Sequence, residues 1–282
     1  MNQVLSGGDD MSASKVLVGV MYSGENEYER CLQSIKLQKG VDVELFAIEN
    51  TPNKEAHDRL YDKFNTDGDR CDLIVKIDAD MILLDDFALH RVVRLFKDNG
   101  SLDHLMIDVH DYLSDMPIPS MNFYSNRVKW RGNDENLIVD YHGSYSGPLI
   151  RIMDGPIANH MSDPGLMQAF YFGIHRCLKA IQPERRKKDV GRAMLHWSII
   201  TRIFESYLRL GDVRRLLAMG GAHFVLNHPN PIECLDYKSD RMSHQCKEFR
   251  ENRSEADLAE LLEDWRYPLK MQKLWFSKLS KS

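Results

Sequence analysis

Short apolar runs alternate with polar stretches of helical periodicity over the first 80 residues. "KVLVGVMY" (15–22), "VDVELFAIEN" (41–50) and "CDLIVKID" (71–78) are apolar and rich in β-branched residues, which is typical of buried strands. Between them, residues 23–38 and 53–65 carry apolar side chains at helical spacing. The order strand, helix, strand, helix, strand predicts parallel strands joined by right-handed crossovers.

The pattern changes further along the chain. Residues 85–100 predict an amphipathic helix with an acidic start and a glycine stop, and residues 103–113 predict another strand. Residues 116–160 mix aromatic, glycine, proline and polar residues, which favours short strands and loops. After Pro164 the apolar positions recur at helical spacing.

These patterns predict an α/β fold with a mostly parallel, Rossmann-like sheet flanked by helices and a helical C-terminal region. We expect the sheet within residues 15–165 and the mainly helical region within residues 166–282. The polar and acidic residues 1–14 lack the apolar core of a signal peptide, and we expect them to form a disordered lead-in.

Composition narrows the function classes. The formal net charge of −5 argues against a broad nucleic-acid surface. The five cysteines form no C-x-x-C pair, which argues against a zinc site and fits a reducing compartment. No run approaches the roughly 20 apolar residues that a membrane span needs. We therefore expect a cytoplasmic protein without a nucleic-acid partner.

Two aspartates close the third predicted strand. If the chain stays extended, Asp78 and Asp80 point the same way, because alternate residues of a strand share a face. Two neighbouring carboxylates repel each other unless a cation lies near them. Oxygen ligands suit Mg²⁺ or Mn²⁺, so the pair predicts a metal site at the strand end. The alternative is an ordinary turn, because a bare D-x-D is common.

Three segments together carry a family resemblance: "NEYERCLQSIKLQ" (26–38), "VELFAIEN" (43–50) and "KIDADMIL" (76–83). With them, residues 15–84 resemble the nucleotide-binding half of a family 2-like glycosyltransferase of the GT-A fold. In such enzymes the D-x-D segment holds the ribose and the Mn²⁺ or Mg²⁺ of a nucleotide-sugar. The resemblance therefore implies these roles for Asp78 and Asp80.

The resemblance also implies a nucleotide pocket at the ends of the first two strands. It places Tyr22 to Glu25 in the pocket wall, although Tyr22 is equally explained as a half-buried aromatic at a strand end. The family usually ends its second strand in D-D-x-S, whereas this chain has "IENTPN". Glu49 or Asn50 would then take the place of the aspartate that contacts the base or ribose.

The segment "GPIANHMSDPG" (155–165) offers further site residues. His160 is a candidate third metal ligand, because neutral imidazole suits Mn²⁺. Asp163 is a candidate general base for the acceptor hydroxyl. The alternative is that Ser162 or Asp163 caps the following helix, with Pro164 at its first position.

Other residues compete for these roles. Asp140 is a second candidate base, and His142 lies beside it in the same predicted loop. His223 and His228 are late histidines able to close over a diphosphate. A single histidine is more often structural than a metal ligand. Among these candidates for the third metal ligand, His160 ranks first, followed by His228 and His142.

The two basic segments suggest partners. "PLKMQKLWFSKLSKS" (268–282) has the composition of a helix lying on an anionic membrane surface, with packing on the protein's own core as the alternative. "PERRKKD" (183–189) reads as a solvated charge run, or as a contact for an anionic acceptor or lipid.

Together these features predict a metal-dependent glycosyltransferase acting on a nucleotide-sugar donor and a glycan or lipid-linked acceptor. The resemblance suggests bacterial surface polysaccharide or lipopolysaccharide synthesis, at the inner face of the membrane. A sugar-phosphate nucleotidyltransferase is less favoured, because "MYSGENEYE" (21–29) has neither a Gly-rich loop nor a basic residue. A non-catalytic binding protein with the same fold is the third hypothesis.

Overall fold

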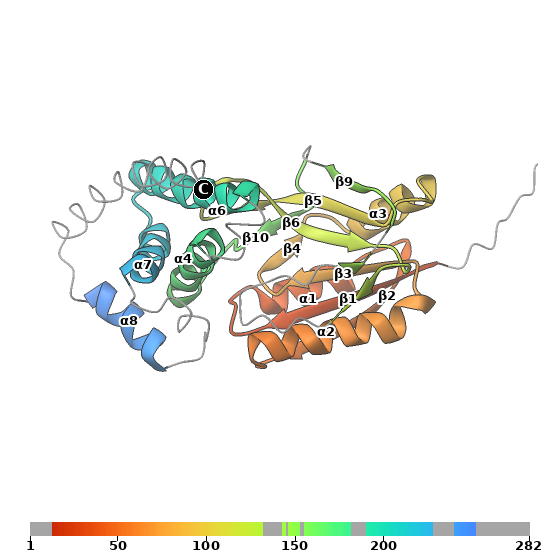
Figure 1. Cartoon of the computed structure of the whole chain (residues 1–282), viewed down its shortest axis with the longest axis horizontal. Helices are drawn as coiled ribbons and strands as arrows, with labels where there is room; N and C mark the ends of the chain where they lie inside the picture. Colours follow the sequence, from red (N-terminus) through yellow and green to blue (C-terminus); the bar gives the residue numbers. More distant parts are fainter. Residues whose placement is uncertain are drawn as a thin grey trace, which may run out of the picture. The chain divides into compact units, whose positions relative to one another are not determined.

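The computed structural model describes residues 13–131, 143–144, 146–152, 155–181, 190–227 and 240–251 (Figure 1). The chain groups into two compact units, Met1–Tyr237 and Lys238–Ser282. The second unit contributes one described helix, α8 (Asp240–Glu251). Every feature discussed below lies in the first unit.

An eight-stranded sheet forms the centre of the first unit. Its order is β2-β1-β3-β6-β5-β10-β4, and β9 pairs with β5 beside this path. The strands are β1 (Ser14–Tyr22), β2 (Val41–Glu49), β3 (Leu73–Asp78), β4 (Met81–Leu83), β5 (His104–Asp111), β6 (Met116–Tyr124), β9 (Leu149–Ile152) and β10 (Ala158–His160). Strand β1 pairs in parallel with β2 and β3, and β5 pairs in parallel with β9 and β10. The β3–β6, β5–β6 and β4–β10 pairs are antiparallel.

Helices flank this sheet and continue after it (Figure 1). Those within the sheet region are α1 (Tyr28–Lys36), α2 (Asn53–Asp67), the short 3₁₀ turn η1 (Gly68–Arg70) and α3 (Ala88–Asp98). Those after it are α4 (Leu166–Ile181), α6 (Val190–Leu210) and α7 (Val213–Asn227). A separate two-stranded pair joins β7 (Lys129–Trp130) to β8 (Gly143–Ser144). The structure confirms the α/β class, the mostly parallel sheet and the helical region that follows.

Helix α2 packs on one face of the sheet through its apolar positions. Leu60 and Phe64 are fully buried and join Leu17 and Ile74 in one hydrophobic cluster. The approach is close at Gly19, where a Cβ atom would lie 2.3 Å from the Leu60 Cδ1 atom. A side chain at this position would therefore have to displace the side chains of Leu60 and Phe46.

Helices α4 and α7 pack against each other at two glycines. A Cβ atom on Gly173 would lie 1.7 Å from the carbonyl oxygen of Ala218, and one on Gly221 would lie 2.0 Å from that of Phe170. Both obstacles are backbone atoms, so the two helix axes are able to come this close only without side chains there. This contact makes α4 and α7 a single packed layer.

Three local predictions are wrong, and others fall outside the described residues. Strand β3 ends at Asp78 and a turn follows, so the chain is not extended through Asp80. Helix α1 begins at Tyr28 rather than at residue 23, because residues 23–27 form bends and turns first. The expected lead-in 1–14 extends too far, because Ser14 is already the first residue of β1. Residues 1–12 of it, the charge run 183–189 and the tail 268–282 lie outside the described residues. No helix in the described part is both long and apolar enough to cross a bilayer.

Candidate functional site

A cavity of about 420 Å³ lies at the carboxyl ends of the parallel strands β1 and β3. Its size falls within the roughly 300–1,000 Å³ of small-molecule sites. Ligands of open α/β sheets bind at this edge. The structure brings Tyr22, Glu25, Asp78, Asp80 and His160 together in the cavity wall.

Strand β10 carries His160 to Asp80 across nearly 80 residues of sequence. Its antiparallel pairing with β4 sets His160 opposite Met81, the residue after Asp80. The backbone N–H of Met161 donates a 2.8 Å hydrogen bond to the carbonyl oxygen of Asp80. As a result the Nε2 atom of His160 lies 3.5 Å from the Oδ1 atom of Asp80.

The other ring nitrogen of His160 contacts Asp111, a residue that sequence analysis did not identify. Parallel pairing of β10 with β5 sets His160 opposite Asp111, and Nδ1 lies 2.6 Å from the Oδ1 atom of Asp111. The Oδ2 atom of Asp111 accepts bonds from the backbone N–H and the hydroxyl of Ser114 at 2.7 and 2.5 Å. An acidic residue at the end of a predicted buried strand was a usable signal, because a buried carboxylate needs a partner.

Several carboxylates lie close together in the site, and burial and their mutual repulsion shift the pKa values of the groups in it. Burial, together with the charges of Asp80 and Asp78, raises the pKa of Glu25 to about 7. Burial also raises the pKa of Asp80 to about 6, with His160 opposing the shift. Burial disfavours the charged form of His160, yet Asp80 and Asp111 outweigh it and raise the pKa of His160 to about 9. A cation at this position would relieve the mutual repulsion of the carboxylates.

The geometry around Asp80 fits a divalent ion held by few protein ligands. The Oδ1 atom of Asp80 is buried and accepts no hydrogen bond, while the Nε2 atom of His160 faces it. Asp78 is partly exposed and its Oδ1 atom lies 3.1 Å from the Nζ atom of Lys76. Among the described residues, no three His, Cys, Asp or Glu side chains already converge on one point. Mg²⁺ needs no such cage, because it typically takes one or two carboxylates plus water and substrate phosphate.

An aromatic pair joins the end of β1 to the start of α1, and a hydrogen bond joins the start of α1 to the end of β2. The rings of Tyr22 and Tyr28 stack with centroids 4.1 Å apart, and the Tyr28 hydroxyl donates a 2.6 Å hydrogen bond to Glu49. Asn50 adopts a φ of 52°, and its N–H donates to the carbonyl oxygen of Tyr22. Tyr22 lines the cavity, whereas Glu49 and Asn50 do not. These two residues therefore lie beside the predicted nucleotide pocket and not in its wall.

The loop between β10 and α4 is fixed by a buried glutamate. Glu27 is 1% exposed, and it accepts hydrogen bonds from the backbone N–H of Asp163 and the side chain of Gln168. The Asp163 carboxylate pairs with Arg214 at 2.7 Å and does not line the cavity. The hydroxyl of Ser162 is buried without a hydrogen-bond partner, so it does not cap α4.

The remaining predicted residues do not join this constellation. Asp140, His142 and His228 lie outside the described residues. His223 lies on α7, where its carbonyl oxygen accepts a hydrogen bond from Asn227, and it does not line the cavity.

Helix α4 supplies a part of the cavity wall that sequence analysis did not assign to the site. Phe172, His175, Arg176 and Lys179 line the cavity, and their spacing puts them on one face of the helix. The guanidinium of Arg176 lies over the Phe172 ring, 4.6 Å from its centroid. His196 of α6 lies next to it, with 3.5 Å between Arg176 Nη1 and His196 Nδ1. Cations buried in an otherwise apolar helix were the available signal.

Comparisons with known proteins add little to this geometry. No protein-family model matches the chain, and no curated protein matches it. Among solved structures, it is similar to the mannosyltransferase PcManGT from Pyrobaculum calidifontis in complex with GDP-Man and Mn²⁺. The alignment has 13% identity, covers 84% of this chain and 88% of that chain, and has a TM-score of 0.34. We base no conclusion on a likeness at this level, and membership of the glycosyltransferase family stays a prediction.

The cavity thus combines an acidic group, a histidine between two aspartates and a basic helix face. Such a set of side chains is able to hold a divalent ion at Asp80 and His160. It is also able to hold anionic groups through that ion and through the basic residues of α4. A substrate carrying a diphosphate is able to contact both the ion at Asp80 and His160 and the basic residues of α4.

Proposed function

We propose that the protein is a metal-dependent glycosyltransferase that moves a sugar from a nucleotide-diphosphate sugar to an acceptor hydroxyl. The observation that carries the proposal is the buried Oδ1 atom of Asp80, which accepts no hydrogen bond and faces the Nε2 atom of His160 in a cavity at the carboxyl ends of the strands. The sequence resemblance of residues 15–84 to family 2-like enzymes supports the same function.

Each residue of the wall has a distinct role in this proposal. Asp80 and His160 hold Mn²⁺ or Mg²⁺, and Asp78 beside them contacts the ribose or the ion. Tyr22 and Glu25 line the nucleotide side of the cavity. When bound, the ion supplies positive charge that stabilises the departing nucleoside diphosphate. The protein supplies position, because β4, β5 and β10 fix the two ligands relative to each other.

The acceptor is proposed to be a glycan or a lipid-linked sugar. The setting would be bacterial surface polysaccharide or lipopolysaccharide synthesis, with the tail 268–282 at the inner membrane face. Asp140 and Asp163 are the proposed bases. For Asp163 to accept a proton, its ion pair with Arg214 has to open first.

The proposal is tested with a panel of nucleotide-sugars and Mn²⁺, by measuring release of the nucleoside diphosphate with and without sugar acceptors. We expect one donor to be consumed only with the metal present. Asp80→Asn should lower this rate about 100-fold or more, because it removes a charged ligand that acts on the leaving group.

Asp108→Asn is the matched control for this experiment. Asp108 is also a buried carboxylate of the same sheet, 4% exposed, but it pairs with Arg151 and does not line the cavity. We expect this variant to keep its activity. An Asp80→Asn variant that folds and turns over the donor at the wild-type rate would refute the proposed function.

A further inference from the structure

The contacts of Asp111 fix which nitrogen of His160 carries a proton. An ionised carboxylate only accepts hydrogen bonds. Since the Oδ1 atom of Asp111 lies 2.6 Å from Nδ1 of His160, this nitrogen has to be the donor. In the neutral ring, the lone pair then lies on Nε2, which is the nitrogen that faces Asp80.

Ser114 determines how the Asp111 side chain is oriented. The backbone N–H of Ser114 donates to the Oδ2 atom of Asp111, and a backbone N–H has no alternative role as an acceptor. The serine hydroxyl donates to the same oxygen. The side of Asp111 that faces Ser114 must therefore always present an acceptor.

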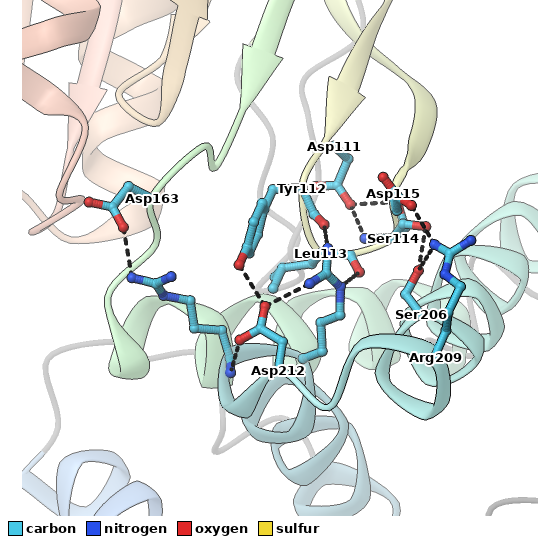
Figure 2. A network of polar contacts seen from close by, with 11 residues as sticks. Asp111, Tyr112, Leu113, Ser114, Asp115, Asp163, Ser206, Arg209 and Asp212 are labelled. Atoms are coloured by element: carbon cyan, nitrogen blue, oxygen red, sulfur yellow. Dashed lines mark hydrogen bonds and ion pairs between the residues drawn. The ribbon is translucent and has the colours of Figure 1, made fainter.

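The turn after β5, which follows Asp111 and contains Ser114, is held by the helical region (Figure 2). Arg215 of α7 is 4% exposed and donates to the carbonyl oxygens of Tyr112 and Leu113. Asp212 accepts a bond from the Tyr112 hydroxyl at 2.6 Å and pairs with Arg215 at 2.6 Å. The position of Asp111 is thereby tied to the junction of α6 and α7.

We propose that Asp111 is a positioning residue that selects the Nδ1–H tautomer of His160 and so presents the Nε2 lone pair to the space beside Asp80. This role rests on the proposed function, in which His160 is a metal ligand. It adds a residue that acts through the histidine without touching the ion or the substrate. Partners of this kind commonly orient metal-binding histidines.

The substitution Asp111→Asn reverses the tautomer for a specific reason. The amide oxygen of asparagine has to face the Ser114 N–H, so its NH₂ group faces His160. The Nδ1 atom must then accept a hydrogen bond, and the proton moves to Nε2. Ring ¹⁵N NMR of the metal-free protein at pH 10 reports this directly, with the His160 signals assigned by their loss in His160→Ala.

We expect the Nδ1–H tautomer in the wild type and the Nε2–H tautomer in Asp111→Asn. Asp108→Asn, a buried carboxylate three residues away on β5, should leave the wild-type tautomer in place. An Nε2–H tautomer in the wild type would overturn the proposal without any variant. So would an unchanged tautomer in a folded Asp111→Asn protein.

Mn²⁺ affinity, measured from the electron paramagnetic resonance of the free ion, gives a second readout. We expect Asp111→Asn to weaken binding about 10-fold or more. In the His160→Ala background the same substitution should have no further effect, because Asp111 acts through the histidine. An equal loss in both backgrounds would show a structural role and contradict the proposal. Because no nucleotide-sugar is present, this result is independent of whether the protein transfers sugar.

Discussion

At the scale of single residues, the partners of the buried aspartates separate structural from functional groups. Asp103 and Asp108 are each paired with an arginine, and Asp111 is hydrogen-bonded to His160 and Ser114. Asp80 differs, because its buried Oδ1 atom accepts no hydrogen bond. A buried carboxylate oxygen that accepts no hydrogen bond is costly for stability unless a cation lies near it. We therefore infer that Asp80, unlike Asp103 and Asp108, serves function and not stability.

Asp103 gives a prediction about the pH dependence of stability. Burial favours its protonated form, but bonds from Ser125, Gly147 and Arg127 outweigh this and hold its pKa below the ordinary 3.8. A lowered pKa adds stability above pH 3.8 that is lost as the pH falls through the folded-state value. We expect Asp103→Asn to lower the Tm by roughly 2–8 °C at pH 7. Thermal melts should show this difference shrinking at pH 3 and below; a difference independent of pH would contradict the assignment.

The sequence alone was sufficient to identify some of the site residues and not others. Asp78 and Asp80 were identified because they follow an apolar strand directly, and this proximity is visible in the sequence. Asp111 was missed because its role depends on His160, which lies 49 residues away and meets it only through strand pairing. Tautomer selection is a property of that contact, and no local pattern encodes it.

At the scale of elements, a strand of only three residues, β10, has the largest effect on the site. β10 spans Ala158–His160 and pairs with both β4 and β5. Three residues are too few for an alternating pattern to be recognised, so the sequence predicted only a polar loop here. The long elements β1, α2 and α4 were predicted correctly, because their periodicity extends over many positions. Pairing across the sheet, which local periodicity does not determine, placed His160.

The junction of α6 and α7 gives a prediction at this scale. Arg215→Met removes the donors to the carbonyl oxygens of Tyr112 and Leu113 and leaves the partly buried Asp212 charge with one partner fewer. We expect a loss of about 2–4 kcal/mol in the free energy of unfolding.

Arg202→Met is the control for that measurement. Arg202 lies on the neighbouring helix α6, but its side chain is 60% exposed and pairs with Glu205 within that helix. Exposed pairs of this kind contribute little to stability. Urea unfolding of both variants measures the difference, and equal losses would show that Arg215 does not hold the turn.

At the scale of the whole first unit, the cavity is built from segments that the sequence assigned to different regions. Its acidic part comes from the ends of β1 and β3, and its basic part comes from α4 and α6. The helical region also holds the turn that follows Asp111. We therefore infer that the helices after the sheet are part of the functional site and not an accessory to it.

The most direct measurement of the central claim is a calorimetric titration of the full-length protein with UDP, GDP and CDP, each with and without Mn²⁺. We predict that one nucleotide binds in the presence of Mn²⁺ and at least about 10-fold more weakly without it, because Asp80 would hold an ion whose positive charge attracts the diphosphate. Asp80→Asn should bind equally weakly in both conditions. Absence of binding by all three nucleotides with Mn²⁺, or identical metal-dependent binding by Asp80→Asn, would contradict the account.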